Sequence, residues 1–258
     1  MGWGDELMVT GLAREAQLRD PRKVRVVYER PRNHEAWKHN PRIALKDEKG
    51  DLQELPGRVN GLRPYMVFKD ERRYVWKPYR VPLGELYFDE EEMLFGARHA
   101  ARVIVEPTVK AGPDSNKDWG WRNWTMLARV LAERGIRVTQ IGPETGPHLE
   151  GVEFVGTGSV RRAAAMLATA RAAVVTEGAL HHVCAVVGCP AVVIYGGFIS
   201  PEVTGYAGQV GIFTGQGLGC GKRAPCGHCR ECMNAITPQR VADELEALLE
   251  KRAGIVAA

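Results

Sequence analysis

ARVIVEP (residues 101–107) is a short apolar run, rich in β-branched residues and closed by a proline, as is typical of a buried strand. Three similar runs follow along the chain: GIRVTQIG (135–142), AAVVTEG (172–178) and PAVVIYGG (190–197). Segments with helical spacing of apolar residues lie between and after these runs, at 124–134, 160–170, 181–188 and 238–252. Strands and helices that alternate in this way predict right-handed crossovers and a parallel sheet covered on both faces. We therefore expect an α/β fold with a Rossmann-like unit from about residue 101 onward.

The first hundred residues are less regular. Residues 5–19 combine an apolar helical face with an acidic start, which favours a helix, and VRVVYE (24–29) is typical of a buried strand. Residues 30–80 are rich in Pro, Gly, Arg and aromatic residues, so short strands and loops are expected there. The acidic stretch 89–92 predicts the start of another helix.

The composition is that of an ordinary folded protein. With 258 residues, 45% of them apolar and 26% charged, the chain is neither disordered, collagenous nor a coiled coil. It has no run of about 18 apolar residues that could span a membrane, and its acidic start, MGWGDELMVTG, differs from a signal peptide. These features predict a cytoplasmic protein whose contact with a membrane would be peripheral. The net charge of +4 is compatible with a phosphorylated ligand or a nucleic acid and establishes neither.

Loops at the carboxyl ends of the predicted strands are the candidate ligand sites, because open parallel sheets bind ligands there. The first loop holds Thr108 and Lys117 shortly before a helix, and a helix start with a nearby lysine suits an anion. A solvated surface loop with one lysine explains the same residues equally well. The loop is a stronger candidate for a binding site when it is taken together with the loops after the later strands.

Two further loops follow the later strands. Thr176–His182 places Gly178 at a turn where backbone N–H groups can approach a phosphate, with His181 one turn into the next helix. The other loop contains Gly196 and Gly197, which permit close approach to the backbone. A capped turn and a plain glycine-rich connection are the alternative interpretations.

The opening segment GWGDELMVTG places two glycines and Asp5 at the start of a helix. It lacks the G-x-G-x-x-G spacing and the preceding strand of a dinucleotide-binding fingerprint. Asp5 therefore has two interpretations: an ordinary helix cap, or a general base if a second domain closes over it.

In combination these segments resemble glycosyltransferase family 9, the ADP-heptose:lipopolysaccharide heptosyltransferase family. GWGDELMVTGLARE (2–15) resembles the family's glycine–aspartate motif, and KDWGWRNWTMLARVLAERGIRVTQIG (117–142) resembles its lysine–tryptophan segment. TEGALHHVCAVVGCPAVVIYGG (176–197) resembles its aspartate–threonine–glycine…histidine motif with the strand that follows, and CGKRAPCGHCRECMNAI (220–236) is similar to its cysteine-bearing C-terminus. The resemblance is strong over residues 1–20 and 101–252 and weak between them.

The resemblance implies a GT-B fold, in which two Rossmann-like domains face a cleft. The N-terminal domain (1–100) would lie on the acceptor side; it is short for the family, so we expect it to be reduced. The C-terminal domain (101–258) would hold a nucleotide-diphosphate sugar. The implied reaction is inverting transfer of the sugar to an acceptor hydroxyl, with no metal or cofactor required for catalysis. Asp5 matches the family's catalytic base, and Lys117 matches the lysine that neutralises the donor diphosphate.

The remaining donor-binding residues follow from the same resemblance. Thr176, Glu177, Gly178 and His181 match the phosphate- and sugar-binding motif, although the family usually has Asp-Thr-Gly at the first three positions. The predicted donor-binding set is Thr108, Lys117, Thr176, Glu177, Gly178, His181, Gly196 and Gly197.

Three functions are compatible with these features. A bacterial envelope saccharide is the family's usual acceptor. The N-terminal half is short for the family, and residues 71–77 interleave basic and aromatic residues, which keeps a hydroxymethylated base in DNA open as the acceptor. The same residues also fit half-buried strands with a solvated basic face. Because Glu177 stands in place of the usual threonine, a third hypothesis is a protein that binds a nucleotide-sugar without catalysing its transfer.

Four cysteines lie within thirteen residues of one another: Cys220, Cys226, Cys229 and Cys232. Their number suits a tetrahedral structural zinc site or an iron–sulfur cluster, but the spacing matches neither the two-knuckle zinc pattern nor a ferredoxin run. Reduced or disulfide-paired cysteines are the alternative. A catalytic metal is not expected.

Overall fold

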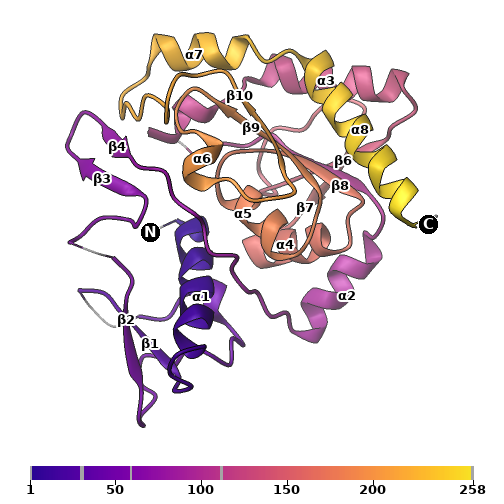
Figure 1. Ribbon diagram of the computed structural model, residues 1–258. Helices are drawn as coiled ribbons and strands as arrows, with labels where there is room; N and C mark the ends of the chain where they lie inside the picture. Colours follow the sequence, from indigo (N-terminus) through magenta and orange to yellow (C-terminus); the bar gives the residue numbers. More distant parts are fainter. Residues whose placement is uncertain (1, 30–31, 59, 111–112, 257–258) are drawn as a thin grey trace.

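The computed structural model describes residues 2–29, 32–58, 60–110 and 113–256. Within them a parallel sheet has the strand order β10-β9-β8-β5-β6-β7 (Figure 1). The strands are β5 (Val103–Glu106), β6 (Val138–Gly142), β7 (Glu153–Gly156), β8 (Ala172–Thr176), β9 (Ala191–Gly196) and β10 (Val210–Phe213). The sequence predicts β5, β6, β8 and β9; the short β7 and β10, at the two edges of the sheet, are not among its predictions.

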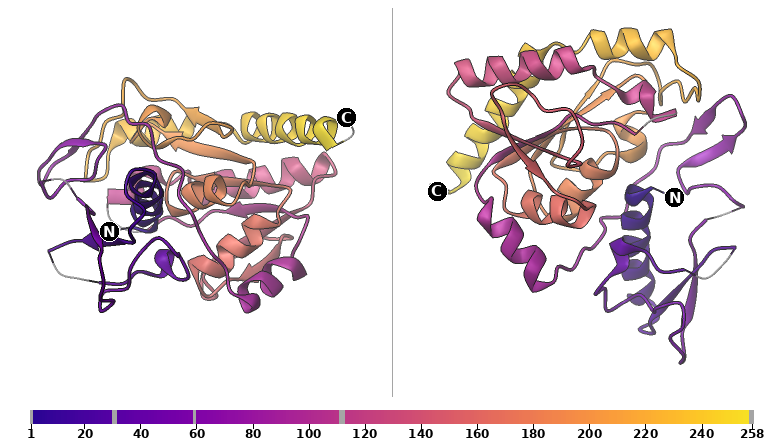
Figure 2. Two further views of the ribbon diagram at one scale, coloured as in Figure 1. Left: turned by 60° about the horizontal axis from the view of Figure 1, so that its bottom comes forward. Right: turned by 180° about the vertical axis from the view of Figure 1, so that it is seen from behind.

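Helices cover both faces of this sheet. Alternate residues of each strand point to opposite faces, so each face presents apolar side chains that a helix can bury. In β5, Val103 and Val105 pack in the cluster that includes α3 and α8, whereas Ile104 packs in the cluster on the other face. The covering helices are α3 (Trp121–Glu133) and α8 (Pro238–Val256) on one face, and α4 (Val160–Ala168) and α5 (Ala179–Val186) on the other (Figures 1 and 2). The short helices α6 (Pro201–Thr204) and α7 (Gly227–Asn234) lie in the connections around β10.

The order of the strands changes direction at β5. The chain first moves from β5 outward through β6 to β7, and then returns to pair β8 with the other side of β5. Such a reversal opens a crevice beyond the carboxyl ends of the two central strands, which is where doubly wound sheets bind ligands. The fold therefore brings Glu106, at the end of β5, and Thr176, at the end of β8, to the same crevice.

Among the described residues, the N-terminal part holds two two-stranded sheets rather than a second large parallel sheet. Helix α1 (Trp3–Gln17) packs against α5 and against a 3-10 turn, η1 (Glu35–Trp37). Strand β1 (Val24–Val27) pairs in parallel with β2 (Gln53–Pro56), and β3 (Met66–Lys69) forms an antiparallel hairpin with β4 (Tyr74–Trp76). Figure 2 shows α1 between this part and the helices of the large sheet.

A buried guanidinium joins the two parts of the chain. Helix α2 (Glu90–Arg98) belongs to the first hundred residues but packs against α4. Arg161 of α4 donates to Glu92 of α2 at 2.5 and 2.7 Å and to the backbone oxygen of Glu35 at 2.9 Å. Only 3% of Arg161 is exposed, so this bond set is shielded from water and fixes α2 and η1 on α4. No helix in the described part of the chain is both long and apolar enough to cross a membrane.

Candidate active site

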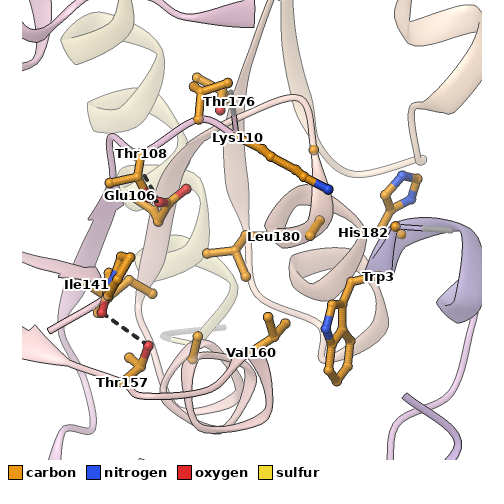
Figure 3. A pocket seen from close by; sticks show the side chains of 18 of the residues that line it. Trp3, Glu106, Thr108, Lys110, Ile141, Thr157, Val160, Thr176, Leu180 and His182 are labelled. Carbon is orange, nitrogen blue, oxygen red and sulfur yellow. Dashed lines mark hydrogen bonds between the residues drawn. The ribbon is translucent and has the colours of Figure 1, made fainter. Parts of the chain in front are cut away.

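A cavity of about 720 Å³ lies beyond the carboxyl ends of β5, β6 and β8 and is bounded on the other side by the first turn of α1. Figure 3 shows Trp3 and His182 on one side of it, facing Glu106, Thr108 and Ile141 across the space. The predicted residues that line it are Asp5, Thr108, Lys117, Thr176, Glu177 and Gly178. The sheet and α1 thus bring together residues from both ends of the sequence.

Asp5 is held from several directions at the start of α1. Its Oδ1 accepts a hydrogen bond from the Tyr65 hydroxyl at 2.8 Å, and its Oδ2 lies 3.1 Å from Arg63 Nε. The backbone N–H of Gly2 also donates to Oδ2, at 3.2 Å. Asp5 therefore makes the contact of a helix cap and lines the cavity at the same time.

The Tyr65 hydroxyl donates a hydrogen bond that holds the Asp5 carboxylate in place. Burial, and after it the negative charge of Asp5, raises the pKa of Tyr65 well above its usual value, so the phenol keeps its proton. The irregular segment before β3 supplies both Tyr65 and Arg63, and the sequence gives no periodic signal for either residue.

Lys117 and Glu177 form an ion pair on the sheet side of the cavity. Lys117 Nζ lies 2.6 Å from Glu177 Oε2, and the two side chains are 12% and 4% exposed. Thr204 donates to the other carboxylate oxygen at 3.2 Å. Burial favours the neutral carboxyl, but the Lys117 ammonium, His181 and the Thr204 hydroxyl together outweigh it and hold the pKa of Glu177 below its usual range. The glutamate that departs from the family motif is therefore the partner of the lysine predicted to bind the diphosphate.

His181 lies behind the cavity wall and does not line it. Its Nδ1 accepts from the Gly178 N–H at 3.0 Å, and its Nε2 lies 2.9 Å from the Thr204 carbonyl oxygen. Burial lowers the pKa of His181, which agrees with a neutral ring that uses both nitrogens on backbone groups. In this structure His181 supports the start of α5 rather than facing a ligand.

The next residue, His182, is the histidine that lines the cavity. Its Nδ1 lies 2.8 Å from the Tyr206 hydroxyl, and burial lowers the pKa of the ring well below its usual value. Its ring packs against Gly4, where a Cβ atom would come within 2.2 Å of His182 Cδ2. The second glycine of GWGDE thus allows α1 to approach α5, which brings Asp5 to the cavity.

Gly196 and Gly197 lie outside the cavity and pack against α7. A Cβ at Gly196 would come within 2.6 Å of Met233, and one at Gly197 within 2.5 Å of Cys232 Sγ. These glycines make room for a helix, so the structure gives them a packing role and does not bring them to the other predicted residues.

Glu106 also lines the cavity, although it is not among the predicted residues. Its Oε1 accepts hydrogen bonds from the backbone N–H of Thr108 at 3.0 Å and from the Thr108 hydroxyl. Burial raises the pKa of Glu106 to about 8. Its place at the carboxyl end of the predicted strand 101–107 is the signal that could have identified it.

Comparison with known proteins identifies the family. Residues 89–231, over half of the chain, match the family model described as glycosyltransferase family 9 (heptosyltransferase). The chain belongs to glycosyltransferase family 9. No curated protein sequence matches it.

Solved structures agree with this membership at the level of the fold. The chain is similar to E. coli ADP-heptose lipopolysaccharide heptosyltransferase II, with 22% identity and a TM-score of 0.50 over 69% of this chain and 56% of that one. It is also similar to the family 9 glycosyl transferase from Veillonella parvula DSM 2008, with 14% identity and a TM-score of 0.67 over 97% and 95% of the two chains. The chain thus spans little more than half of the E. coli enzyme. Its fold is of the GT-B type.

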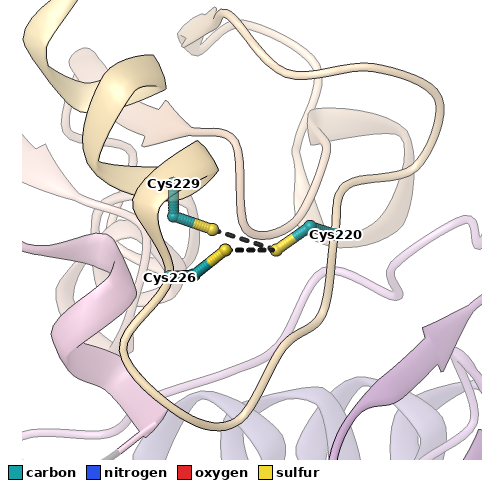
Figure 4. Close-up of side chains that lie close together, drawn as sticks. All are labelled: Cys220, Cys226 and Cys229. Carbon is teal, nitrogen blue, oxygen red and sulfur yellow. Dashed lines mark hydrogen bonds between the residues drawn. The ribbon is translucent and has the colours of Figure 1, made fainter.

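Three of the four clustered cysteines of this family 9 member come together (Figure 4). Cys220 Sγ lies 3.0 Å from Cys229 Sγ and 4.0 Å from Cys226 Sγ. Cys232 points elsewhere, with its Sγ 3.5 Å from the Thr214 oxygen. Three sulfurs this close suit three positions of a tetrahedral thiolate site. No disulfide joins the cysteines that the structure describes.

Proposed function

We propose that this chain transfers a sugar from a nucleotide-diphosphate sugar to an acceptor hydroxyl, with inversion at the anomeric carbon and without a catalytic metal. One observation carries the proposal: Asp5, on α1, and the group around Lys117, at the ends of the sheet strands, line the same cavity. Inversion by direct displacement needs a base and a leaving group on opposite sides of the anomeric carbon. A carboxylate and a cation on different walls of one cavity support that arrangement.

Asp5 is the proposed general base. It would accept the acceptor's proton as the hydroxyl oxygen attacks the anomeric carbon and the bond to the diphosphate breaks. Arg63 and Tyr65 hold its carboxylate from the cavity's edge, so the side chain needs little reorganisation before the reaction.

The diphosphate is proposed to lie between Thr108, Lys117 and the start of α5. Helix α5 begins after Gly178, and its first backbone N–H groups suit an anion. Lys117 would stabilise the charge of the leaving diphosphate through its ammonium group, which lies on the cavity wall. Thr176 and Gly178 would complete this side. His181 would act by holding the Gly178 turn.

A saccharide of the bacterial envelope is the proposed acceptor, with residues 1–100 on the acceptor side and 101–258 on the donor side. One observation favours the second candidate, a hydroxymethylated base in DNA. On the β3–β4 hairpin, Lys69, Arg72 and Arg73 are exposed, and Phe68 is 51% exposed. A basic surface with an exposed aromatic ring suits phosphates and an unstacked base. The same surface also suits peripheral contact with an anionic membrane.

A structural metal is proposed at Cys220, Cys226 and Cys229. The loop that carries them is anchored beside Lys117, because the Asn116 amide donates to the backbone oxygens of Lys222 and Ala224 at 2.7 and 2.9 Å. Zinc there would stiffen the loop and supply no step of the transfer. The local thiol cluster also supports our proposal of a cytoplasmic location.

Donor binding is the first test. ADP, UDP, GDP, TDP and CMP, with their common sugars, are compared by thermal shift, since a ligand at 100 times its dissociation constant stabilises a fold by about 2.7 kcal/mol. One class of nucleotide is expected to raise the melting temperature. If none does so for a folded sample, the transferase proposal fails.

Turnover is the second test. Asp5→Asn is expected to keep the donor's thermal shift and lose transfer, whereas Asp47→Asn, the same change at an exposed carboxylate, is expected to keep both. Full transfer by Asp5→Asn would remove Asp5 from the mechanism. Donor binding by the wild-type chain without transfer to either acceptor class would favour the non-catalytic reading.

A further inference from the structure

Glu106 is a carboxyl in the cavity for which the proposed mechanism has no use. It ends β5 at the switch point, and its backbone pairs with Val175 of β8, next to the strand end that carries Thr176 and Glu177. The carboxyl therefore lies in the crevice, where a donor's diphosphate is proposed to bind. Figure 3 shows it beside Thr108 on the wall opposite His182.

Hydrogen bonds distinguish the two oxygens of this carboxyl. Oε1 accepts both from the Thr108 backbone N–H and from the Thr108 hydroxyl. Because Oε1 already accepts two hydrogen bonds, it acts as the carbonyl oxygen when the carboxyl is protonated. The proton of a neutral Glu106 would therefore be on Oε2. In the described structure no protein group donates to Oε2, which leaves an O–H group for a ligand in the cavity.

No other charged group on the described cavity wall contributes to the pKa of Glu106. Asp5 pairs with Arg63, and Lys117 pairs with Glu177. The other titratable residues of the wall come from α1, the segment before β3, the loops after β5 and β6, the end of β8 and α5. They are Asp5, Arg63, Tyr65, Lys110, Lys117, Glu144, Glu177 and His182. Burial raises the pKa of Glu106 to about 8, opposed only by the Thr108 N–H, and none of these charges offsets the effect.

We propose that Glu106 binds the donor as a neutral acid, with its Oε2 hydroxyl donating a hydrogen bond to a diphosphate oxygen. This inference rests on the proposed function and extends it by one binding residue. A carboxylate at the same place would repel the diphosphate, whereas the acid adds a donor beside Thr108 and Lys117. The affinity for the donor then depends on whether Glu106 is protonated in the free protein.

The test is the pH dependence of nucleotide affinity, measured by calorimetry from pH 6.5 to 9.5. The probe is whichever of ADP, UDP, GDP and TDP gives the largest thermal shift. If only the acid form binds, the dissociation constant rises about tenfold between pH 7 and pH 9. Glu106→Gln keeps a neutral donor of the same shape, so its affinity is expected to stay within twofold over this range. Glu144→Gln, a change of another wall glutamate, is expected to keep the alkaline loss.

Different results overturn different proposals. A wild-type affinity that stays flat to pH 9.5, or the same alkaline loss in Glu106→Gln, rules out Glu106 as the titrating group. If no nucleoside diphosphate binds the wild-type protein at any pH, the proposed function fails as well. A flat wild-type profile overturns the proposal even if Glu106→Gln does not fold.

Discussion

The hydroxyl of Tyr65 lies 2.8 Å from Asp5 Oδ1, although 60 positions separate the two residues in the sequence. Tyr65 is 4% exposed and Asp5 is 9% exposed, so water competes little for this hydrogen bond. The bond ties the first turn of α1 to the segment before β3. It fixes the direction of the carboxylate that we propose as the base.

Tyr65→Phe is expected to lower the transfer rate at saturating donor by tenfold or more, because a hydrogen bond to a charged group is worth about 1.5–3 kcal/mol. The dissociation constant of the nucleotide should not change, since Tyr65 lies on the Asp5 side. Tyr28→Phe is the matched control: Tyr28 donates at 2.9 Å to Glu6, also on α1 but outside the cavity. Equal losses of activity in both variants would show that Tyr65 acts through stability alone.

Gly4→Ala is expected to destabilise the protein by about 1–3 kcal/mol, the usual cost of forcing a methyl group into a packed contact. Its Cβ would overlap the His182 ring, so α1 must move away from α5 and take Asp5 with it. Urea unfolding measures the stability. Gly2→Ala is the control, because a Cβ at Gly2 meets only Asp5 Oδ2, at 3.9 Å. Similar stabilities for the two variants would contradict tight packing at Gly4.

Glu177→Gln tests whether the glutamate competes with a donor for Lys117. The change removes Glu177 as the ion-pair partner of Lys117, and breaking a largely buried pair from one side costs up to about 3–5 kcal/mol. The melting temperature of the free variant should therefore fall. A diphosphate should restore more stability to this variant than to the wild type, since Glu177 no longer competes with it for Lys117. A smaller ligand-induced shift than in the wild type would show that Glu177 instead positions Lys117 for the donor.

The raised pKa of Glu106 predicts a dependence of stability on pH. The folded protein keeps the proton up to about pH 8, whereas an unfolded glutamate releases it near 4.5. The stabilisation is complete below pH 4.5 and is lost as the pH rises to about 8, at no more than about 1.4 kcal/mol per pH unit. Urea unfolding of the wild type and Glu106→Gln at pH 5, 6.5 and 8 should show a difference that changes in this direction. A constant difference would mean that Glu106 is ionised in the folded protein throughout.

The thiol cluster predicts bound metal. Mass spectrometry of the purified protein is expected to find about one zinc ion per chain, and a chelator should lower the melting temperature. Cys229→Ser should lose the metal, whereas Cys189→Ala, at a buried thiol outside the cluster, should retain it. A metal-free protein that is insensitive to chelator would leave the three thiols as ordinary packing.

Much of the architecture follows from local pattern. The run ARVIVEP predicts a buried strand, and Ile104 and its neighbours do pack on alternate faces of a covered sheet. Strands and helices of this kind are set by periodicity within a few residues, which a sequence displays directly. The same reasoning identifies the strand ends, and with them Thr108, Lys117 and Thr176–Gly178 on the cavity wall. It does not identify β7 or β10, because these edge strands are only partly buried and lack the continuous apolar run of β5.

Only the tertiary structure decided which side chains face the cavity. His181 and His182 are adjacent in the sequence, and the helical turn of about 100° between them sends one to Thr204 and the other to the cavity. Tyr65 reaches Asp5, and Glu177 reaches Lys117, through contacts between elements far apart in the chain. Gly196 and Gly197 make room for α7, a helix absent from the sequence prediction. Local pattern fixes where the chain ends its strands, whereas the partners of a side chain depend on packing between elements.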